Sequence, residues 1–170
     1  MAGQGPDLVF GPSDNVAVFA GTFDPITLGH EDVIRRAAAL FDRLLVGVAS
    51  AHHKVPRLSH AKRMVLCQEV LADTPNVEVV PFDGLLVDFC QTHGASVMVR
   101  SARHASDFDY EAQLAAMNRK LAPQVQTVML LPEASLQCIS STLVREISAL
   151  GGSLEALVSV PVQRAMAQPE

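Results

Sequence analysis

The residues with the clearest chemical potential are Gly29 and His30, a pair expected at the beginning of a helix. Before them, residues 16–20 are β-forming and predict a buried strand, and Gly21 allows a sharp turn. Thr27 is expected to cap the helix, so that its free N–H groups and positive dipole end face the loop. This arrangement predicts a phosphate site in which the His30 imidazole forms a hydrogen bond to the phosphate. The alternative is a solvent-facing histidine in an ordinary first helical turn.

Basic residues are expected at the ends of later strands. Lys54 follows the apolar run 43–49, and Arg100 ends the apolar run 96–100, with Arg103 close behind it. Each could bind a phosphate group. Lys54 and Arg103 could equally be surface residues. Arg100 needs a partner or a water-filled cleft, and its alternative role is an ion pair with Asp107 or Glu111.

Strand and helix patterns alternate along the chain, which predicts parallel strands with right-handed crossovers. We expect an α/β fold with a doubly wound, Rossmann-like, five-stranded parallel sheet in a single domain. The expected strands are 16–20, 43–49, 77–80, 96–100 and 126–131. One expected helix follows His30, with helical spacing of its apolar residues as far as Phe41. The others cover 59–71, 85–93, 107–121, 140–150, 154–158 and 161–167. Ser59 is expected to cap the helix over 59–71, and residues 107–121 present an apolar side formed by Phe108, Leu114, Met117 and Leu121. Ligands of such sheets bind beyond the carboxyl ends of the strands.

Composition restricts the class of protein. The 170 residues fit one domain, assigned to 15–168, and residues 1–14 are expected to be a disordered tail or a cloning remnant. A net charge of −5 argues against a nucleic-acid partner, and no apolar run is long enough for a membrane span. The three cysteines, Cys67, Cys90 and Cys138, are expected to be buried free thiols in a cytoplasmic protein, without a metal site.

Residues 21–30 (GTFDPITLGH) resemble the signature of nucleotidyltransferases with an (H/T)-x-G-H motif, and in particular the bacterial phosphopantetheine adenylyltransferase family. Four later segments are similar to blocks of that family, in the expected order: 82–89 (FDGLLVDF), 107–111 (DFDYE), 117–123 (MNRKLAP) and 139–146 (ISSTLVRE). Together the matches cover about residues 16–152 and are highly specific.

This resemblance implies transfer of the adenylyl group of ATP to 4′-phosphopantetheine, giving dephospho-coenzyme A and pyrophosphate. The attack is in line and needs no covalent enzyme intermediate, so positioning and charge stabilisation supply the catalysis. It also implies Mg²⁺ bound with ATP, a homohexamer, and coenzyme A as a feedback inhibitor.

The resemblance also implies roles for individual residues. The catalytic residues are His30, Lys54 and Arg100, with His30 on the α-phosphate. The substrate-binding residues for 4′-phosphopantetheine are Thr22, Lys54, Leu86, Arg100 and Asn118. The ATP-binding residues are Thr22, Phe23, His30, Ser101, Ala102, Arg103, Glu111, Leu136, Gln137, Cys138, Ile139, Ser140, Ser141 and Thr142, of which Glu111 faces the ribose and the last three face the β- and γ-phosphates; Ser140 and Ser141 could also be only a helix cap.

The chain departs from the family pattern at several positions. Ser101 and Ala102 stand where Gly-Leu is usual, so ATP binding could be altered, and Leu136 replaces a residue that is often aromatic. Two other functions remain open: a related adenylyl- or cytidylyltransferase acting on another small phosphate, such as nicotinamide mononucleotide or glycerol 3-phosphate, and a non-catalytic sensor of nucleotide or coenzyme A.

Overall fold

The computed structural model describes residues 15–50 and 55–167. Its core is one five-stranded sheet in the order β3-β2-β1-β4-β5, and every neighbouring pair of strands is parallel. The strands are β1 (Val16–Gly21), β2 (Arg43–Ala49), β3 (Val77–Phe82), β4 (Val97–Ser101) and β5 (Gln126–Leu130). The helices are α1 (Leu28–Ala38), α2 (His60–Val70), α3 (Leu86–Thr92), α4 (Ala105–Leu121), α5 (Ser141–Ala149) and α6 (Val160–Met166), with one 3₁₀ turn, η1 (Ala134–Leu136). The predicted doubly wound, Rossmann-like parallel sheet is confirmed.

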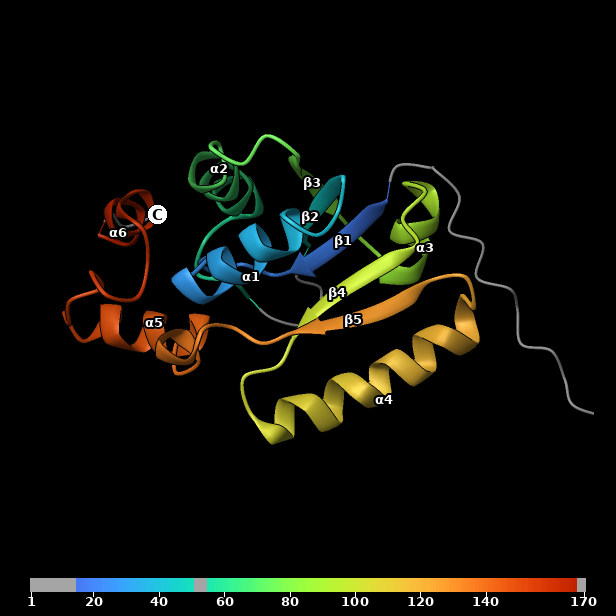
Figure 1. Cartoon of the computed structure of the whole chain (residues 1–170). Helices are drawn as coiled ribbons and strands as arrows, with labels where there is room; N and C mark the ends of the chain where they lie inside the picture. Colours follow the sequence, from blue (N-terminus) through green and yellow to red (C-terminus); the bar gives the residue numbers. More distant parts are fainter. Residues whose placement is uncertain (1–14, 51–54, 168–170) are drawn as a thin grey trace, which may run out of the picture.

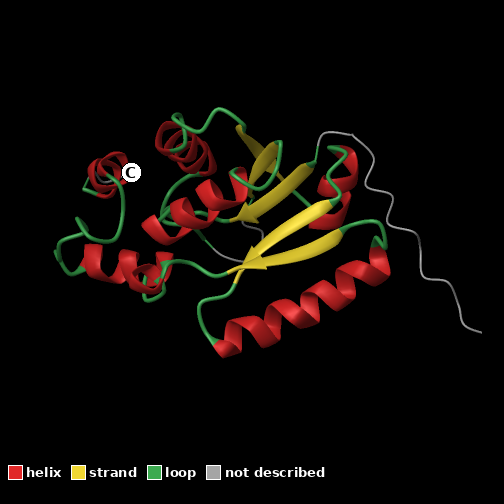
Figure 2. Ribbon diagram, in the orientation of Figure 1, coloured by secondary structure: helices red, strands yellow, loops and turns green. Residues whose placement is uncertain are grey.

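Helices cover both faces of the sheet (Figure 1). Along β1 the side chains alternate: Ala17 and Phe19 pack into the cluster beneath α1 and α2, whereas Val18 and Ala20 pack into the cluster beneath α3. All four are almost completely buried, as expected for the central strand of a sheet that is covered on both sides. Figure 2 shows α5 and α6 beyond the carboxyl ends of the strands, which is the edge where the polar residues were expected.

Three predicted helix caps are confirmed. The side-chain oxygens of Thr27, Ser59 and Ser140 accept hydrogen bonds from backbone N–H groups in the first turns of α1, α2 and α5, respectively. Gly94 follows α3 with φ at +66°, the left-handed conformation for which glycine carries no steric cost. Because a cap depends on neighbours within one turn, the sequence predicts the starts of α1, α2 and α5 and the end of α3.

Two predictions about helices are wrong. Residues 154–158 form turns rather than a helix, with the N–H groups of Leu157 and Val158 both donating to Leu154 O. These two bonds close a single turn, and the next helical bond is that of Gln163 N to Ser159 O, which already belongs to α6. The first helix also ends at Ala38, before Phe41.

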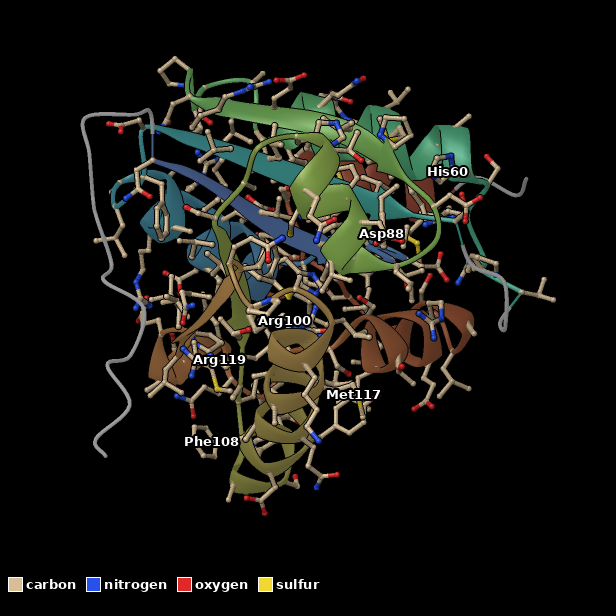
Figure 3. The ribbon with its side chains drawn as sticks, turned by 90° about the vertical axis from the view of Figure 1, so that its right-hand side faces the viewer. His60, Asp88, Arg100, Phe108, Met117 and Arg119 are labelled. Carbon is tan, nitrogen blue, oxygen red and sulfur yellow. The ribbon has the colours of Figure 1, made fainter. Side chains whose placement is uncertain are left out.

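Large apolar residues of α4 are exposed in the single chain, on more than one side of the helix. Phe108, Met117 and Leu121 are more than half exposed, whereas Glu111 is the buried residue of this helix. Phe108 and Met117 project from opposite sides of α4, and Arg100 lies where the helix meets the sheet (Figure 3). Met117 and Leu121 share a side because they are about one turn apart. The prediction of one apolar side formed by Phe108, Leu114, Met117 and Leu121 is therefore wrong for Phe108.

Candidate active site

A cavity of about 440 Å³ opens at the carboxyl edge of the sheet between β1 and β4. At this point the order of the strands reverses, because β2 and β3 lie on one side of β1 and β4 and β5 lie on the other. Such a switch point is where open α/β sheets bind ligands. Residues from the end of β1, the start of α1, the end of β4, α4, and the start of α5 line the cavity.

His30 lines this cavity from the third position of α1. Its ring meets the edge of Phe23, with ring centroids 5.3 Å apart and planes at 81°. Burial lowers the pKa of His30 from 6.5 to about 4, and the positive charge of Arg103 contributes in the same direction. The imidazole is therefore neutral at neutral pH, and the predicted placement in the first helical turn is confirmed.

This pKa shift makes a prediction about stability. As the pH falls from about 6.5 towards 4, His30 takes up a proton in the unfolded chain but not in the folded protein. Protonation therefore stabilises the unfolded chain, and the free energy of unfolding falls. We expect wild-type protein to lose more unfolding free energy over this range than His30→Gln. Urea unfolding of both proteins at successive pH values measures this loss. Subtracting one pH curve from the other removes the titration of the carboxylates, which the two proteins share. Parallel pH curves would contradict the prediction.

Arg100 and Glu111 form a two-point ion pair at the wall of the cavity. Arg100 Nε and Nη2 each donate to a different oxygen of Glu111 over 2.7 Å, and Nη1 donates to Ala20 O over 3.3 Å. The side chains are 24% and 10% exposed. The ion pair considered from sequence is thus present, with Glu111 rather than Asp107 as the partner. Arg100 nevertheless lines the same cavity as His30.

Breaking this ion pair is expected to destabilise the fold. Glu111→Gln keeps the shape of the side chain but removes the charge from a mostly buried, two-point interaction, so we expect a loss of about 2 kcal/mol. Urea unfolding measures it, with Glu78→Gln as the matched control because Glu78 pairs with Arg43 at the exposed surface. An equal loss of unfolding free energy in Glu111→Gln and Glu78→Gln would contradict a stabilising role for the Arg100–Glu111 ion pair.

Arg103 joins the start of α4 to the segment before α5. Its N–H and Nε both donate to Asp107 Oδ2 over 3.1 Å, and Nη1 donates to Ile139 O over 3.4 Å. Burial alone would raise the pKa of Asp107, but the hydrogen bonds and charge of Arg103 lower it on balance. Arg103 therefore faces the cavity as a cation that is held in place from both sides.

The start of α5 forms another wall of the cavity. Ser140 Oγ caps the helix by accepting from Leu143 N over 3.2 Å, and Ser141 Oγ donates to Pro25 O over 2.8 Å. Thr142 also lines the cavity. The helix-cap alternative for Ser140 is therefore present, and the same residues stand at the positive end of the helix dipole, where anions bind favourably.

Most of the site residues predicted from sequence meet in this one cavity: Phe23, His30, Arg100, Ser101, Arg103, Glu111, Leu136, Ile139, Ser140, Ser141 and Thr142. Five others lie elsewhere among the described residues: Thr22 and Cys138 are exposed, Ala102 is buried, Leu86 packs against the core beneath α3, and Asn118 donates to Met98 Sδ over 3.4 Å. Gln137 likewise is not part of the lining, and its amide donates to Pro132 O. Lys54 and the predicted tail 1–14 lie outside the described residues, so their assignments stay predictions.

Two other expectations need correction. Cys67 and Cys90 are buried free thiols, as predicted, but Cys138 is exposed. The start of α1 also offers fewer free amides than expected, because Leu28 N donates to Leu157 O and His30 N donates to Thr27 Oγ1. Side chains therefore contribute more to this site than the helix amides alone.

Some residues of the site were not predicted from sequence: Ser106 and Tyr110 line the cavity from α4, and Arg63 supports it from α2. Tyr110 belongs to the recognised 107–111 block, and that was its available signal. Arg63 is 1% exposed and donates to the carbonyl oxygens of Thr22, Ala49 and Leu58. No sequence pattern indicated a buried arginine there.

Within the described residues, no group of three or more His, Cys, Asp or Glu side chains is placed to hold a metal ion. None of the helices in the described part of the chain is long and apolar enough to cross a membrane.

The fold and cavity define a nucleotidyltransferase: residues 18–147 match the cytidylyltransferase-like family.

Comparison with individual proteins narrows this class. A phosphopantetheine adenylyltransferase of Acidovorax sp. (strain JS42) is 56% identical over 144 residues, which cover 85% of this chain and 87% of that protein. The enzyme of Aromatoleum aromaticum is 48% identical over 91% of this chain and 95% of its own. The chain therefore belongs to the phosphopantetheine adenylyltransferase family.

A solved structure supports the fold. A Vibrio parahaemolyticus protein proposed to be a nicotinate-nucleotide adenylyltransferase matches with a TM-score of 0.67 over 91% of each chain. At 17% sequence identity, this likeness concerns the fold alone.

Proposed function

We propose that this protein transfers the adenylyl group of ATP to 4′-phosphopantetheine and releases dephospho-coenzyme A and pyrophosphate, the penultimate step of coenzyme A biosynthesis. The observation that carries the proposal is that His30, Arg100 and the start of α5 line one cavity at the switch point between β1 and β4. Cations, a neutral imidazole and a helix N-terminus around one cavity suit the binding of several phosphate groups.

The reaction requires two phosphate groups to meet. A phosphate oxygen of 4′-phosphopantetheine attacks the α-phosphorus of ATP, and the bond to the bridging oxygen breaks as pyrophosphate leaves with its electron pair. His30 donates a hydrogen bond to the α-phosphate as negative charge grows there. Arg100 holds the attacking phosphate, together with Thr22 from the loop after β1 and Lys54 from the loop after β2.

The remaining cavity residues bind ATP. Arg103 and residues 136–142 contact the nucleotide, with Ser140 to Thr142 facing its β- and γ-phosphates. Glu111 contacts the ribose while it holds Arg100, because a carboxylate has about four acceptor positions and the ion pair uses two of them. The pantetheine arm extends from the cavity towards Leu86 and Asn118.

Mg²⁺ bound with ATP would neutralise charge on the phosphate oxygens of the nucleotide. Asp107 faces Arg103 and Glu111 faces Arg100, so the carboxylates of the cavity are already paired with cations. Phosphate oxygens and water are therefore the expected ligands of the ion.

The protein is proposed to act in the cytoplasm as a homohexamer that coenzyme A inhibits. Buried free thiols at Cys67 and Cys90 suit a reducing compartment. The exposed apolar residues Met117 and Leu121, about one turn apart on α4, suit a surface that other copies cover. Coenzyme A contains the pantetheine arm and an adenine nucleotide, so it fits the same cavity.

A pyrophosphate-release assay with ATP tests the proposal. We expect turnover with 4′-phosphopantetheine that exceeds turnover with nicotinamide mononucleotide or glycerol 3-phosphate by at least about 10²-fold, because only the first acceptor can occupy both the phosphate and the arm sites. Preference for another acceptor would assign a related transferase. Tight coenzyme A binding without pyrophosphate release from any acceptor would assign a sensor.

A further inference from the structure

The hydrogen bonds around His30 point to a role for Thr27 that rests on the proposed function. We propose that Thr27 is a positioning residue, which holds the His30 imidazole as the neutral tautomer with its proton on Nε2 and thereby makes it a fixed hydrogen-bond donor to the transferring phosphate. Thr27 itself is 1% exposed, so water does not compete for these bonds.

The backbone of Thr27 carries the argument. Its N–H lies 3.1 Å from His30 Nδ1. A backbone N–H can only donate, so Nδ1 must accept and cannot carry a proton. A neutral imidazole with an accepting Nδ1 has its proton on Nε2.

The hydroxyl group of Thr27 adds a second donor. Its Oγ1 lies 3.0 Å from Nδ1 and also accepts from His30 N over 3.4 Å. Because Oγ1 accepts from the backbone, its own hydrogen is free to point at Nδ1. Two donors thus meet at one ring nitrogen, which disfavours both the Nδ1–H tautomer and the imidazolium ion.

The position of the ring then directs Nε2 to the substrate. Nδ1 faces Thr27 within the helix cap, whereas the imidazole lines the cavity and packs edge-on against Phe23. A donor held in place before the substrate binds costs no reorganisation during the reaction.

The surrounding charges agree with a neutral ring. The charged side chains around the cavity are Arg100 at the end of β4, Arg103 in the loop after it, and Asp107 and Glu111 on α4, with Glu31 as the acidic neighbour on α1 itself. The two carboxylates of α4 that line the cavity, Asp107 and Glu111, are paired with the two arginines, so neither is left to stabilise a histidine cation. Arg103 adds to burial in lowering the pKa of His30 to about 4.

Nitrogen NMR of wild-type protein with ¹⁵N-labelled histidine tests the tautomer without any substrate. We expect His30 at pH 7 with an unprotonated Nδ1 and a protonated Nε2. A protonated Nδ1, or a doubly protonated ring, overturns the proposal. This measurement is independent of turnover, so it stands even if the proposed reaction is not found.

Substitution tests the consequence for catalysis. Thr27→Val removes the hydroxyl but keeps the backbone N–H, so Nδ1 should stay unprotonated at pH 7 while one donor holds the ring in place of two. We expect a kcat about tenfold lower, as for the loss of one hydrogen bond, with KM values unchanged within about twofold. Thr27→Ser keeps the hydroxyl and should restore kcat.

Loss of a helix cap needs its own control. Ser59→Ala removes the cap of α2, where Ser59 Oγ accepts from Lys62 N over 3.3 Å, and should lower stability without lowering kcat. An unchanged kcat in Thr27→Val, or a loss of kcat that Thr27→Ser does not restore, overturns the positioning role.

Discussion

Replacing His30 with alanine is expected to lower kcat for pyrophosphate release by about 10²- to 10³-fold, the usual effect of removing one preorganised donor to developing charge. The Kd for ATP should change little, because the nucleotide keeps Arg103 and the start of α5 as partners. The physical reason is that charge on the α-phosphate grows on the way to the transition state, so a donor placed there contributes more to the rate than to binding.

Steady-state kinetics together with ATP titration by calorimetry separate these two quantities. His93→Ala is the matched control, since His93 packs on Phe89 and is not part of the cavity lining. It should retain full kcat. A His30→Ala protein that keeps its kcat, or that loses rate and ATP affinity in equal proportion, would contradict the proposed role of the imidazole.

Replacing Arg63 with methionine is expected to lower the free energy of unfolding by about 3–5 kcal/mol, because a buried cation supports several acceptors at once. Arg63 Nη1 donates to Thr22 O over 2.6 Å and to Ala49 O over 2.8 Å, and Nε donates to Leu58 O over 3.2 Å. These carbonyl groups belong to the loop after β1, the end of β2 and the start of the α2 region, so the variant removes the donor from one buried and two partly buried acceptors.

The charge of Asp24 explains why the cation is tolerated. Burial lowers the pKa of Arg63, and the nearby negative charge of Asp24 opposes that shift. Asp24 also accepts from the backbone N–H groups of Arg57 and Leu58, both over 2.9 Å. Arg63 and Asp24 thus join the loops after β1 and β2, which is where the proposed phosphate ligands Thr22 and Lys54 originate.

Urea unfolding with an unchanged m-value measures the effect of Arg63→Met. The same substitution at Arg43, which pairs with Glu78 at the exposed surface, should cost less than about 1 kcal/mol. A similarly small effect at Arg63 would show that its hydrogen bonds do not hold the two loops together.

The amino-acid sequence by itself determined the strands, the helix caps and the likeness to one enzyme family. Val16 to Ala20, Thr27 and Ser140 were predictable because a strand pattern or a cap depends on residues within one turn or one strand. The alternation of strands and helices then predicts a parallel sheet, whose carboxyl edge gathers His30 and Arg100.

Only the tertiary structure decided how side chains from separate elements pair. Arg100 contacts Glu111 rather than Asp107, and Arg63 is buried against three carbonyl groups from distant segments. The apolar residues of α4, such as Phe108, face away from this sheet. Such contacts depend on the distance and angle at which elements cross, and a periodic pattern states only which face of an element is apolar, not what lies opposite it.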